Sequence, residues 1–319
     1  TEAGQVVIRD MASQVDVVIH NFRPGTMDTL NLGCDALRAI NPRLVYMAIS
    51  GFGTQGPLRR APAYDPIIQA HSGMAATQGG DNSPAFIRSL LCDKITAYTA
   101  CQAVTSALFA RERSGEGQLI DLSMLDSGLF FMFPDGFQNH ALLDEDAVPG
   151  GMLIDILYDL TLTKDGGITV AAANQEMQGR MLKAIGLLHL LGDERFDTMQ
   201  KLVENLQVFR DLVAEKCLEY GSDELLALLR EVEVPCAKCL TRDEVLAQEQ
   251  LSANDSIGEV DHPHLGMLRI VKAPPRFGGE RLEPSHPAPA HGEHTDAVLA
   301  DFGLDSRQID ALRSEGVLG

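Results

Sequence analysis

The chain has 319 residues, of which 45% are apolar and 22% are charged, and its formal net charge at pH 7 is −19. These proportions exclude wholesale disorder, and the length suggests about two domains of roughly 150 residues each. The excess of acidic side chains argues against a general partner for nucleic acid or for an anionic membrane, because both attract basic surfaces. A small anionic ligand remains possible, since it needs only a local positive pocket.

Membrane insertion and secretion are not indicated either. The longest uninterrupted apolar stretch, Gly128 to Pro134, is far shorter than the roughly 20 residues of a membrane-spanning helix. No signal segment opens the chain, and the six cysteines are sparse and irregularly spaced, which fits a reducing compartment. We therefore expect a cytoplasmic protein. Residues 1–5 look like mid-protein sequence, so we also expect that an N-terminal part is missing.

The first elements alternate between strand and helix. Apolar strand-like runs at 16–20 and 44–49 enclose a helix-like segment at 34–40. This alternation predicts parallel α/β units, in which ligands bind at the loops beyond the carboxyl ends of the strands. The turns at 20–25 and 50–57 occupy that kind of position.

A long helix is predicted over 93–113, because apolar residues recur there at intervals of three and four. A strand at 119–123 and an apolar helix at 124–140 follow. The next stretch is acidic and then contains proline and glycine, which predicts a linker over 141–160.

The remainder divides into two parts. Residues 161–250 combine a hairpin-like turn at 163–167 and a strand at 168–172 with helical patterns, which predicts a smaller domain. Ser222 is expected to cap one of its helices, and the pattern at 241–244 is a capping box. The Pro-, Gly- and His-rich stretch at 271–295 must cross a surface before a last helix at about 295–315.

Three features that could carry chemistry are better explained structurally. Cys236 and Cys239 form a C-x-x-C pair, but no second pair exists, so we interpret them as structural thiols. The histidines between 262 and 294 have the spacing of no closed ligand set, and we predict no metal site. The three glycines of 51–56 match neither phosphate-loop fingerprint, so the segment is expected to be a flexible turn.

Asp93 stands at the start of the long predicted helix. The ordinary interpretation is an N-cap carboxylate, which stabilises a helix by about 1 kcal/mol. In the same position, a carboxylate could serve as a covalent nucleophile on an activated acyl group, with helix amides stabilising the oxyanion. Cys92 beside it is a rival nucleophile without a local histidine base.

Several segments together resemble the class III CoA-transferase family, the formyl-CoA transferase and carnitine CoA-transferase type, which also includes α-methylacyl-CoA racemase. In chain order they are Asp16–Gly25, Asn41–Tyr46 with Ser50–Gly53, Ala63–Asp65 with Gln69–Gly73, Cys92–Lys94, Ala107–Gln118, Val234–Cys236 and Pro289–Asp296. Each segment is weak alone, but their order and spacing extend over nearly the whole chain.

The resemblance implies a fold and an assembly. It implies an α/β fold with an open, Rossmann-like CoA-binding domain over 1–140, incomplete at its start. The linker at 141–160 would lead to an inserted α+β domain at 161–250, and 251–319 would return to the large domain. Members of the family form interlocked homodimers.

The resemblance also implies a mechanism without ATP. Asp93 falls at the position of the family's catalytic aspartate, which attacks the acyl-CoA thioester and carries the acyl group as an anhydride and CoA as an aspartyl thioester. The substrates would be acyl-CoA and a small carboxylic acid, with no permanently bound cofactor. The carboxylate must be ionised to attack, so we expect surroundings that do not raise its pKa much.

CoA contacts carry over to two segments, one lining the nucleotide and one near the pantetheine end. The residues are Asn21, Phe22 and Arg23 in the first segment, and Ala63, Tyr64 and Asp65 in the second. Arg23 suits a phosphate because its planar guanidinium donates paired hydrogen bonds.

Some positions depart from the family pattern. A basic residue that often follows the Pro-Gly turn is Thr29 here, and the Gly-rich loop of formyl-CoA transferase is reduced to Pro149–Gly151. A racemase-like enzyme is one alternative, but Tyr64 replaces the racemase histidine and has an ordinary pKa near 10, poorly matched to proton abstraction at neutral pH. An inactive CoA-binding fragment is the other alternative.

Overall fold

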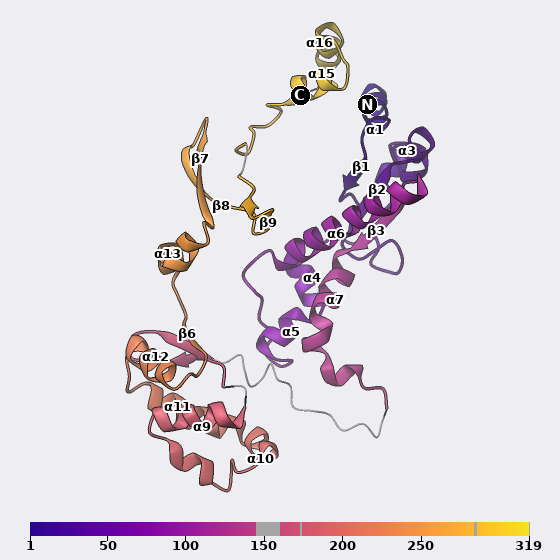
Figure 1. Ribbon diagram of the computed structural model, residues 1–319. Coiled ribbons are helices and arrows are strands. Elements are labelled where there is room, and N and C mark those ends of the chain that lie inside the picture. Colours follow the sequence, from indigo (N-terminus) through magenta and orange to yellow (C-terminus); the bar gives the residue numbers. More distant parts are fainter. Residues whose placement is uncertain (145–159, 173, 284–285, 319) are drawn as a thin grey trace. The chain divides into compact units, whose positions relative to one another are not determined.

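The computed structural model describes residues 1–144, 160–172, 174–283 and 286–318 (Figure 1). Contacts divide the chain into two compact units. Unit 1 comprises Thr1–Ala141 and Pro289–Gly319, and unit 2 comprises Leu142–Ala288. The short Gly-rich loop expected at 149–151 lies outside the described residues.

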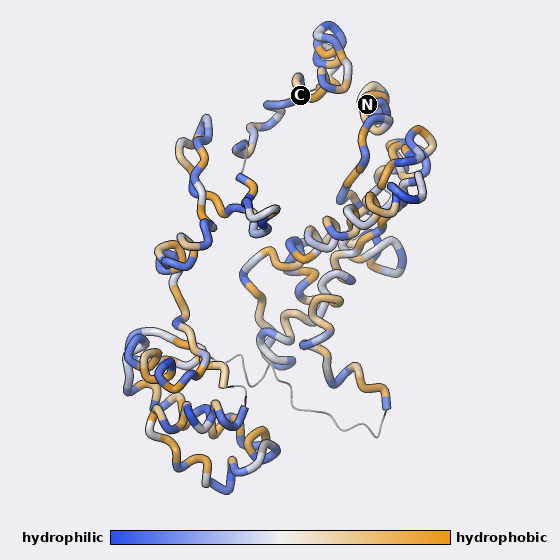
Figure 2. Tube along the Cα trace, in the orientation of Figure 1, coloured by the Kyte–Doolittle hydropathy of each residue, from blue (hydrophilic) through white to orange (hydrophobic). Residues whose placement is uncertain are grey.

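Unit 1 is built on a parallel sheet. Its strands β1 (Val17–His20), β2 (Val45–Ser50) and β3 (Leu119–Ser123) pair in that order. The register places Val17 opposite Val45 and Tyr46 opposite Leu119. Consecutive β-branched residues favour the strand in β1, whose trace is mostly hydrophobic in Figure 2. The predicted parallel α/β arrangement is confirmed.

Helices connect and flank these strands. They are α1 (Glu2–Ala12), α2 (Thr26–Thr29), α3 (Cys34–Ile40), α4 (Asp65–His71), α5 (Met74–Gly79), α6 (Leu91–Ser114), α7 (Met124–Gly136), the 3₁₀ turn η1 (Gln138–Ala141), α15 (Thr295–Asp301) and α16 (Ser306–Ser314). One apolar core gathers Leu37, Leu44 and Tyr46 between α3 and the sheet, and a second gathers Ile68, Met74 and Cys92 among α4, α5 and α6.

The long helix α6 is anchored at its C-terminal end. The guanidinium of Arg111, which is buried, donates to Asp16 Oδ1 at 2.8 Å and to the carbonyl of Arg43 at 3.2 Å. Because Asp16 and Arg43 precede β1 and β2, this end of α6 lies at the amino ends of the strands. Its first turn therefore lies toward their carboxyl ends. The predicted helix is confirmed, although Tyr98, counted in its apolar pattern, is 69% exposed.

The predicted last helix is wrong in one respect, because it is broken in two. Gly303 has a φ of 94° between α15 and α16, a left-handed conformation that ends the first helix. The two short helices bury Leu299 and Ile309. Helix α1, which was not predicted, lies beside this segment, and the side-chain amide of Gln14 donates to the carbonyl of Phe302 at 3.5 Å.

Unit 2 combines an antiparallel sheet, helices and hairpins. Strands β4 (Thr161–Leu162), β5 (Gly167–Val170) and β6 (Cys236–Lys238) form the sheet. The helices are α9 (Gln175–Ala184), η2 (Leu188–Gly192), α10 (Met199–Glu204), α11 (Leu206–Cys217), α12 (Ser222–Glu231), α13 (Arg242–Ala247) and α14 (Glu249–Ala253). The hairpin strands are β7 (Ile257–His262) with β8 (Gly266–Val271), and β9 (Arg276–Phe277) with β10 (Glu280–Arg281).

Two helix starts in unit 2 test the capping predictions. The capping box before α13 is confirmed, since Thr241 Oγ1 accepts from the Glu244 amide and Glu244 Oε2 accepts from the Thr241 amide. The prediction that Ser222 caps α12 is wrong. The cap position is Gly221. Asp165 Oδ1, from the turn between β4 and β5, accepts the Ser222 amide at 2.8 Å.

Candidate functional site

A cavity of about 590 Å³ opens in unit 1 where the three parallel strands end. It is lined by Asn21, Phe22, Arg23, Ile49, Ser50, Gly51, Ala61, Pro62, Ala63, Tyr64, Asp93, Thr96, Ala97 and Met124. The first three residues follow β1, Gly51 follows β2 and Met124 follows β3. Open α/β sheets bind ligands at the carboxyl ends of their parallel strands, so this cavity lies where the sheet topology predicts a ligand site.

Five of the six sequence-predicted contact residues line this cavity together with Asp93. Asp65 is the exception and lies behind the wall. Of the described lining residues, one is cationic, Arg23, and one is anionic, Asp93. The aromatic side chains of Phe22 and Tyr64 are 52% and 75% exposed, so their rings are open to a ligand rather than packed in a core.

Close packing of two loops shapes the wall. A Cβ placed on Gly51 would stand 2.2 Å from the Cβ of Ala63, a distance that two carbon atoms cannot adopt. The carbonyl of Gly51 also accepts from the amide of Leu125 at 3.0 Å. Gly51 is therefore a close-approach position between neighbouring loops, which corrects the expectation of a merely flexible turn.

His20 organises the turn that follows β1, although no local motif points to that role. Its Nδ1 accepts the backbone amide of Phe22 at 3.2 Å, and its ring stacks on Phe22 and meets Tyr46 edge-on. Burial lowers the pKa of His20, which favours the neutral ring that can accept this bond. A histidine directly before a cavity turn was the available signal.

Asp93 is the third residue of α6, and the expectation that it is the N-cap is wrong. Leu90 occupies that position and has no side-chain capping bond. The Asp93 side chain is exposed at the cavity, and among the described residues it forms no salt bridge. A carboxylate there is close to the amides of the first helical turn, which favour negative charge.

Partial desolvation of the side chain, followed by the negative charge of Asp65, raises the pKa of Asp93. The expectation that the surroundings do not raise this pKa much stays a prediction, because the direction alone is resolved. Both causes disfavour the charged form. The carboxylate at the cavity is therefore less stabilised by its surroundings than an ordinary surface aspartate.

Asp65 is buried, with 2% of its surface exposed, at the start of α4. Its Oδ2 accepts the backbone amide of Asp93 at 3.1 Å, and its Oδ1 accepts from the Gln69 amide at 2.6 Å. The carboxylate thus connects α4 to the first turn of α6 and does not line the cavity that contains Asp93.

Cys92 is not placed as a rival nucleophile. Its side chain is fully buried in the core beside Ile68 and Met74. Burial, Asp65 and Asp93 raise the pKa of its thiol to about 11. Since the thiolate is the reactive form, a thiol in this setting is unreactive at neutral pH.

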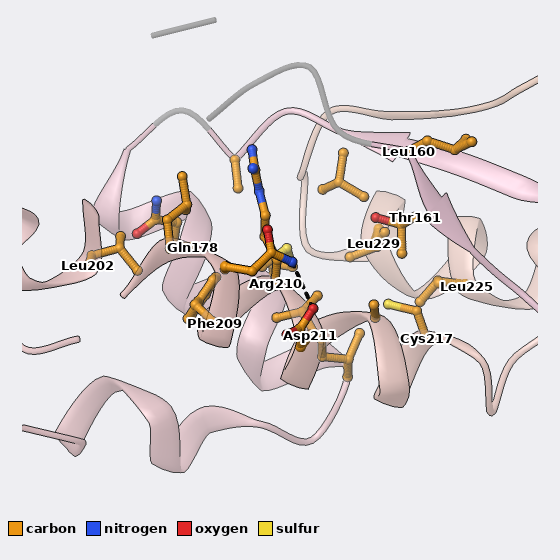
Figure 3. A pocket seen from close by; sticks show the side chains of 18 residues that line it. Leu160, Thr161, Gln178, Leu202, Phe209, Arg210, Asp211, Cys217, Leu225 and Leu229 are labelled. Carbon is orange, nitrogen blue, oxygen red and sulfur yellow. Dashed lines mark hydrogen bonds between the residues drawn. The ribbon is translucent and has the colours of Figure 1, made fainter. Parts of the chain in front are cut away.

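Unit 2 contains a separate cavity of about 310 Å³ among α9, α11, α12 and β5 (Figure 3). Its wall is mostly apolar, including Phe209, Leu225 and Leu229, and the two charged lining residues are Arg210 and Asp211. Asp211 accepts from the Gln207 amide at 2.8 Å. None of the sequence-predicted site residues lies in this cavity.

The structure also bears on the C-x-x-C pair, on metal binding and on membrane-spanning helices. Burial raises the pKa of Cys236, the opposite of the lowered pKa of a redox thiol, and Cys239 is exposed. No group of three or more His, Cys, Asp or Glu is placed to hold a metal ion in the described ranges. Nor does any helix in those ranges have both the length and the hydrophobicity required to cross a bilayer.

Comparison with known proteins adds a family to this geometry. Residues 1–295 match the family described as CoA-transferase family III. The chain is 30% identical to a succinyl-CoA–D-citramalate CoA-transferase of Chloroflexus aurantiacus over 100% of this chain and 80% of that protein. It is 26% identical to the succinyl-CoA:glutarate CoA-transferase of Homo sapiens over 99% of this chain and 73% of that protein. A solved CAIB/BAIF family protein from Brucella suis has a TM-score of 0.79 at 30% identity, covering 95% of this chain and 79% of that structure.

Proposed function

The chain belongs to CoA-transferase family III and is an enzyme of that class, and from this premise we propose that it moves CoA from an acyl-CoA donor to a carboxylic acid with Asp93 as the covalent nucleophile. The observation that carries the proposal is the position of Asp93. Its carboxylate lies in the cavity at the carboxyl ends of three parallel strands, facing loops from β1, β2 and β3.

The reaction proceeds through two anhydrides. The Asp93 carboxylate attacks the thioester carbonyl, the carbon–sulfur bond breaks, and CoA leaves as a thiolate from an acyl–aspartyl anhydride. The thiolate attacks the aspartyl carbonyl, which releases the donor acid and leaves an aspartyl–CoA thioester. The acceptor carboxylate displaces CoA in the same way, and the thiolate then attacks the acceptor carbonyl to form the new acyl-CoA and free Asp93. Covalent catalysis of this kind conserves the thioester energy.

Different cavity residues contact different parts of the CoA substrate. Arg23 binds a phosphate of CoA, Asn21 and Phe22 line the nucleotide, and Ala63 and Tyr64 face the pantetheine end. The positive end of the α6 dipole stabilises the oxyanion that forms at each attack. CoA enters as a substrate thioester, and the mechanism uses no resident cofactor or metal.

Small dicarboxylic acids are the substrates that we propose to test first. The printed names of the relatives from Chloroflexus aurantiacus and Homo sapiens pair succinyl-CoA with D-citramalate and with glutarate. We therefore propose succinyl-CoA as the donor and a short dicarboxylate as the acceptor.

We also propose a cytoplasmic, interlocked homodimer. Helix α7 leaves aromatic side chains uncovered within the chain: Phe130 is 83% exposed, Phe131 54% and Phe133 45%. Exposed apolar patches of this kind are typical of interaction surfaces. Light scattering on the purified protein tests the assembly, and a monomer at all concentrations would contradict it.

Trapping of the intermediate tests the nucleophile. The protein is incubated with succinyl-CoA and then with hydroxylamine, and mass spectrometry locates the resulting hydroxamate. We expect the label on Asp93, and we expect Asp93→Asn to lower turnover by at least about 10³-fold. Cys92→Ala is the matched control, which keeps both label and turnover because the thiol faces the core.

The same preparation distinguishes the two alternatives. Exchange of deuterium into the α-carbon of a 2-methylacyl-CoA, without transfer of CoA, would support a racemase. Binding of CoA by calorimetry without turnover of any thioester would support an inactive binding module. Either result, or full turnover by Asp93→Asn, would contradict the proposed function.

A further inference from the structure

We propose that Asp65 is a positioning residue: its buried carboxylate fixes the backbone of Asp93 where the nucleophile must stand, and Gln69 holds Asp65 and the entry to α6 in place. The inference rests on the proposed role of Asp93 as nucleophile. It assigns to Asp65 an indirect function in place of the direct CoA contact that the family resemblance implied.

The start of α6 needs a partner from elsewhere. The first amides of a helix have no acceptor within the helix, and a side chain at the N-cap usually accepts one of them. Leu90 at this N-cap has no side-chain oxygen. Asp65, from α4, accepts the amide of Asp93 at 3.1 Å instead. The bond is made to the backbone of the reacting residue itself.

Gln69, one turn further along α4, secures this arrangement and is 1% exposed. Its Nε2 lies 2.6 Å from Asp65 Oδ1, 3.0 Å from the carbonyl of Ile87 and 3.2 Å from that of Ser89. Its Oε1 accepts the Ile87 amide at 3.0 Å. Both ends of one side chain therefore hold the segment that leads into α6, and the same side chain orients the carboxylate of Asp65.

The arrangement has an electrostatic consequence. Asp65 accepts the backbone amide of Asp93, so two carboxylates lie near the first turn of α6, and like charges disfavour each other's ionised form. When Asp93 attacks a thioester, it gives up its negative charge to the anhydride bond, so the repulsion from Asp65 is relieved as the bond forms. Asp65 thus fixes the nucleophile and favours its acylation.

Asp65→Asn is the primary test because it keeps the size of the side chain. Single-turnover acylation at Asp93 by succinyl-CoA is expected to slow by roughly 10–100-fold, since small misplacement of a reacting group is costly. KM for the acyl-CoA stays close to the wild-type value, because Asp65 does not line the cavity. In carboxyl-carbon NMR, assigned with Asp93→Asn, the pKa of Asp93 falls.

Asp165→Asn is the matched control, because Asp165 accepts the first amide of α12 in the same way and has no reacting neighbour. It should leave acylation, KM and the pKa of Asp93 unchanged. If Asp65→Asn does not fold, as judged by circular dichroism, Gln69→Glu replaces it. That variant keeps the acceptor for Ile87, removes the donor to Asp65, and should slow acylation as well.

The outcomes separate this inference from the proposed function. If the wild-type protein carries no label on Asp93, the proposed function fails. If it is labelled, and a folded Asp65→Asn or Gln69→Glu variant acylates at the wild-type rate with an unchanged pKa of Asp93, Asp65 does not position the nucleophile. A rise in KM with unchanged acylation would restore the direct contact with CoA.

Discussion

At the starts of α6 in unit 1 and α12 in unit 2, a first-turn amide requires a hydrogen-bond acceptor, and a carboxylate supplies it in both. Neither N-cap residue, Leu90 or Gly221, has a side chain that accepts a hydrogen bond. In both cases an aspartate from an earlier segment accepts an amide of the first turn: Asp65 at α6 and Asp165 at α12. A carboxylate near a helix start is favourable in either place.

The surroundings make the two caps differ. Asp165 is exposed, and hydrogen bonds from the Ser222 amide and hydroxyl lower its pKa. Asp65 is buried, and its charge contributes to raising the pKa of Asp93. Asp165 therefore stabilises only the start of a helix, whereas Asp65 also raises the pKa of Asp93, which is exposed at the cavity. The same local device is structural in unit 2, and in unit 1 we propose that it also positions Asp93.

The largest difference is expected when the supporting side chains are removed. Gln69→Leu leaves the Ile87 amide and the Asp65 carboxylate buried without their partner, which costs about 3 kcal/mol and lowers turnover. Thr163→Val removes the hydroxyl that lies 2.6 Å from Ser222 Oγ, which costs about 1 kcal/mol and leaves turnover unchanged. Chemical denaturation and steady-state kinetics measure both. If Gln69→Leu and Thr163→Val lowered turnover equally, the contrast between a functional cap in unit 1 and a structural cap in unit 2 would be contradicted.

A methyl group added to a glycine should distinguish the units by activity. Gly51→Ala forces the loop after β2 away from Ala63, and we expect turnover to fall by roughly 10–100-fold as the cavity wall shifts. Gly192→Ala in unit 2 is the control, because a Cβ there meets nothing within 4 Å. Kinetics with succinyl-CoA decide. Full activity of Gly51→Ala would show that the wall tolerates the shift.

Asp165→Asn should change stability with a defined pH dependence. The folded pKa of Asp165 lies below its ordinary value of 3.8, so its contribution to stability is present above that pH and is lost as the pH falls through the folded pKa. The variant should be less stable than the wild type at pH 7, with the difference shrinking in acid. A thermal-melting series checks this, and a pH-independent difference would contradict it.

The smallest effect on stability is expected at Asp93, with the opposite sign. The folded pKa of Asp93 lies above its ordinary value of 3.8, so the wild type loses stability as the pH rises through the folded pKa. Asp93→Asn should therefore be slightly more stable than the wild type at pH 7 and equal to it below pH 3.8. Thermal melting at both pH values measures the difference. A less stable variant at pH 7 would contradict the raised pKa.

Much of unit 1 could be predicted from local pattern. The apolar runs of β1 and β2 and their alternation with helical segments predict a parallel sheet. The loops beyond its strands then follow as the place for a ligand, and the residues Asn21–Arg23, Ala63, Tyr64 and Asp93 are brought together there. Local pattern failed at helix ends, at Ser222, at Gly303 and in the cap assigned to Asp93.

Those failures share a physical cause. A helix cap is predicted from the residue next to the helix, but α6 and α12 take theirs from side chains 28 and 57 residues away. Which acceptor reaches an amide depends on how distant elements pack. The roles of Asp65 and His20 were hidden for the same reason.

By itself, the sequence determined the elements of the sheet, the family and the carboxylate at the start of the long helix, because strand and helix patterns and ordered motifs are properties of neighbouring residues. Only the tertiary structure decided that Asp65 lies behind the cavity wall, that Cys92 faces the core, and that burial with a second carboxylate raises the pKa of Asp93. Burial and charge–charge interaction depend on distances in space between residues that are far apart along the chain.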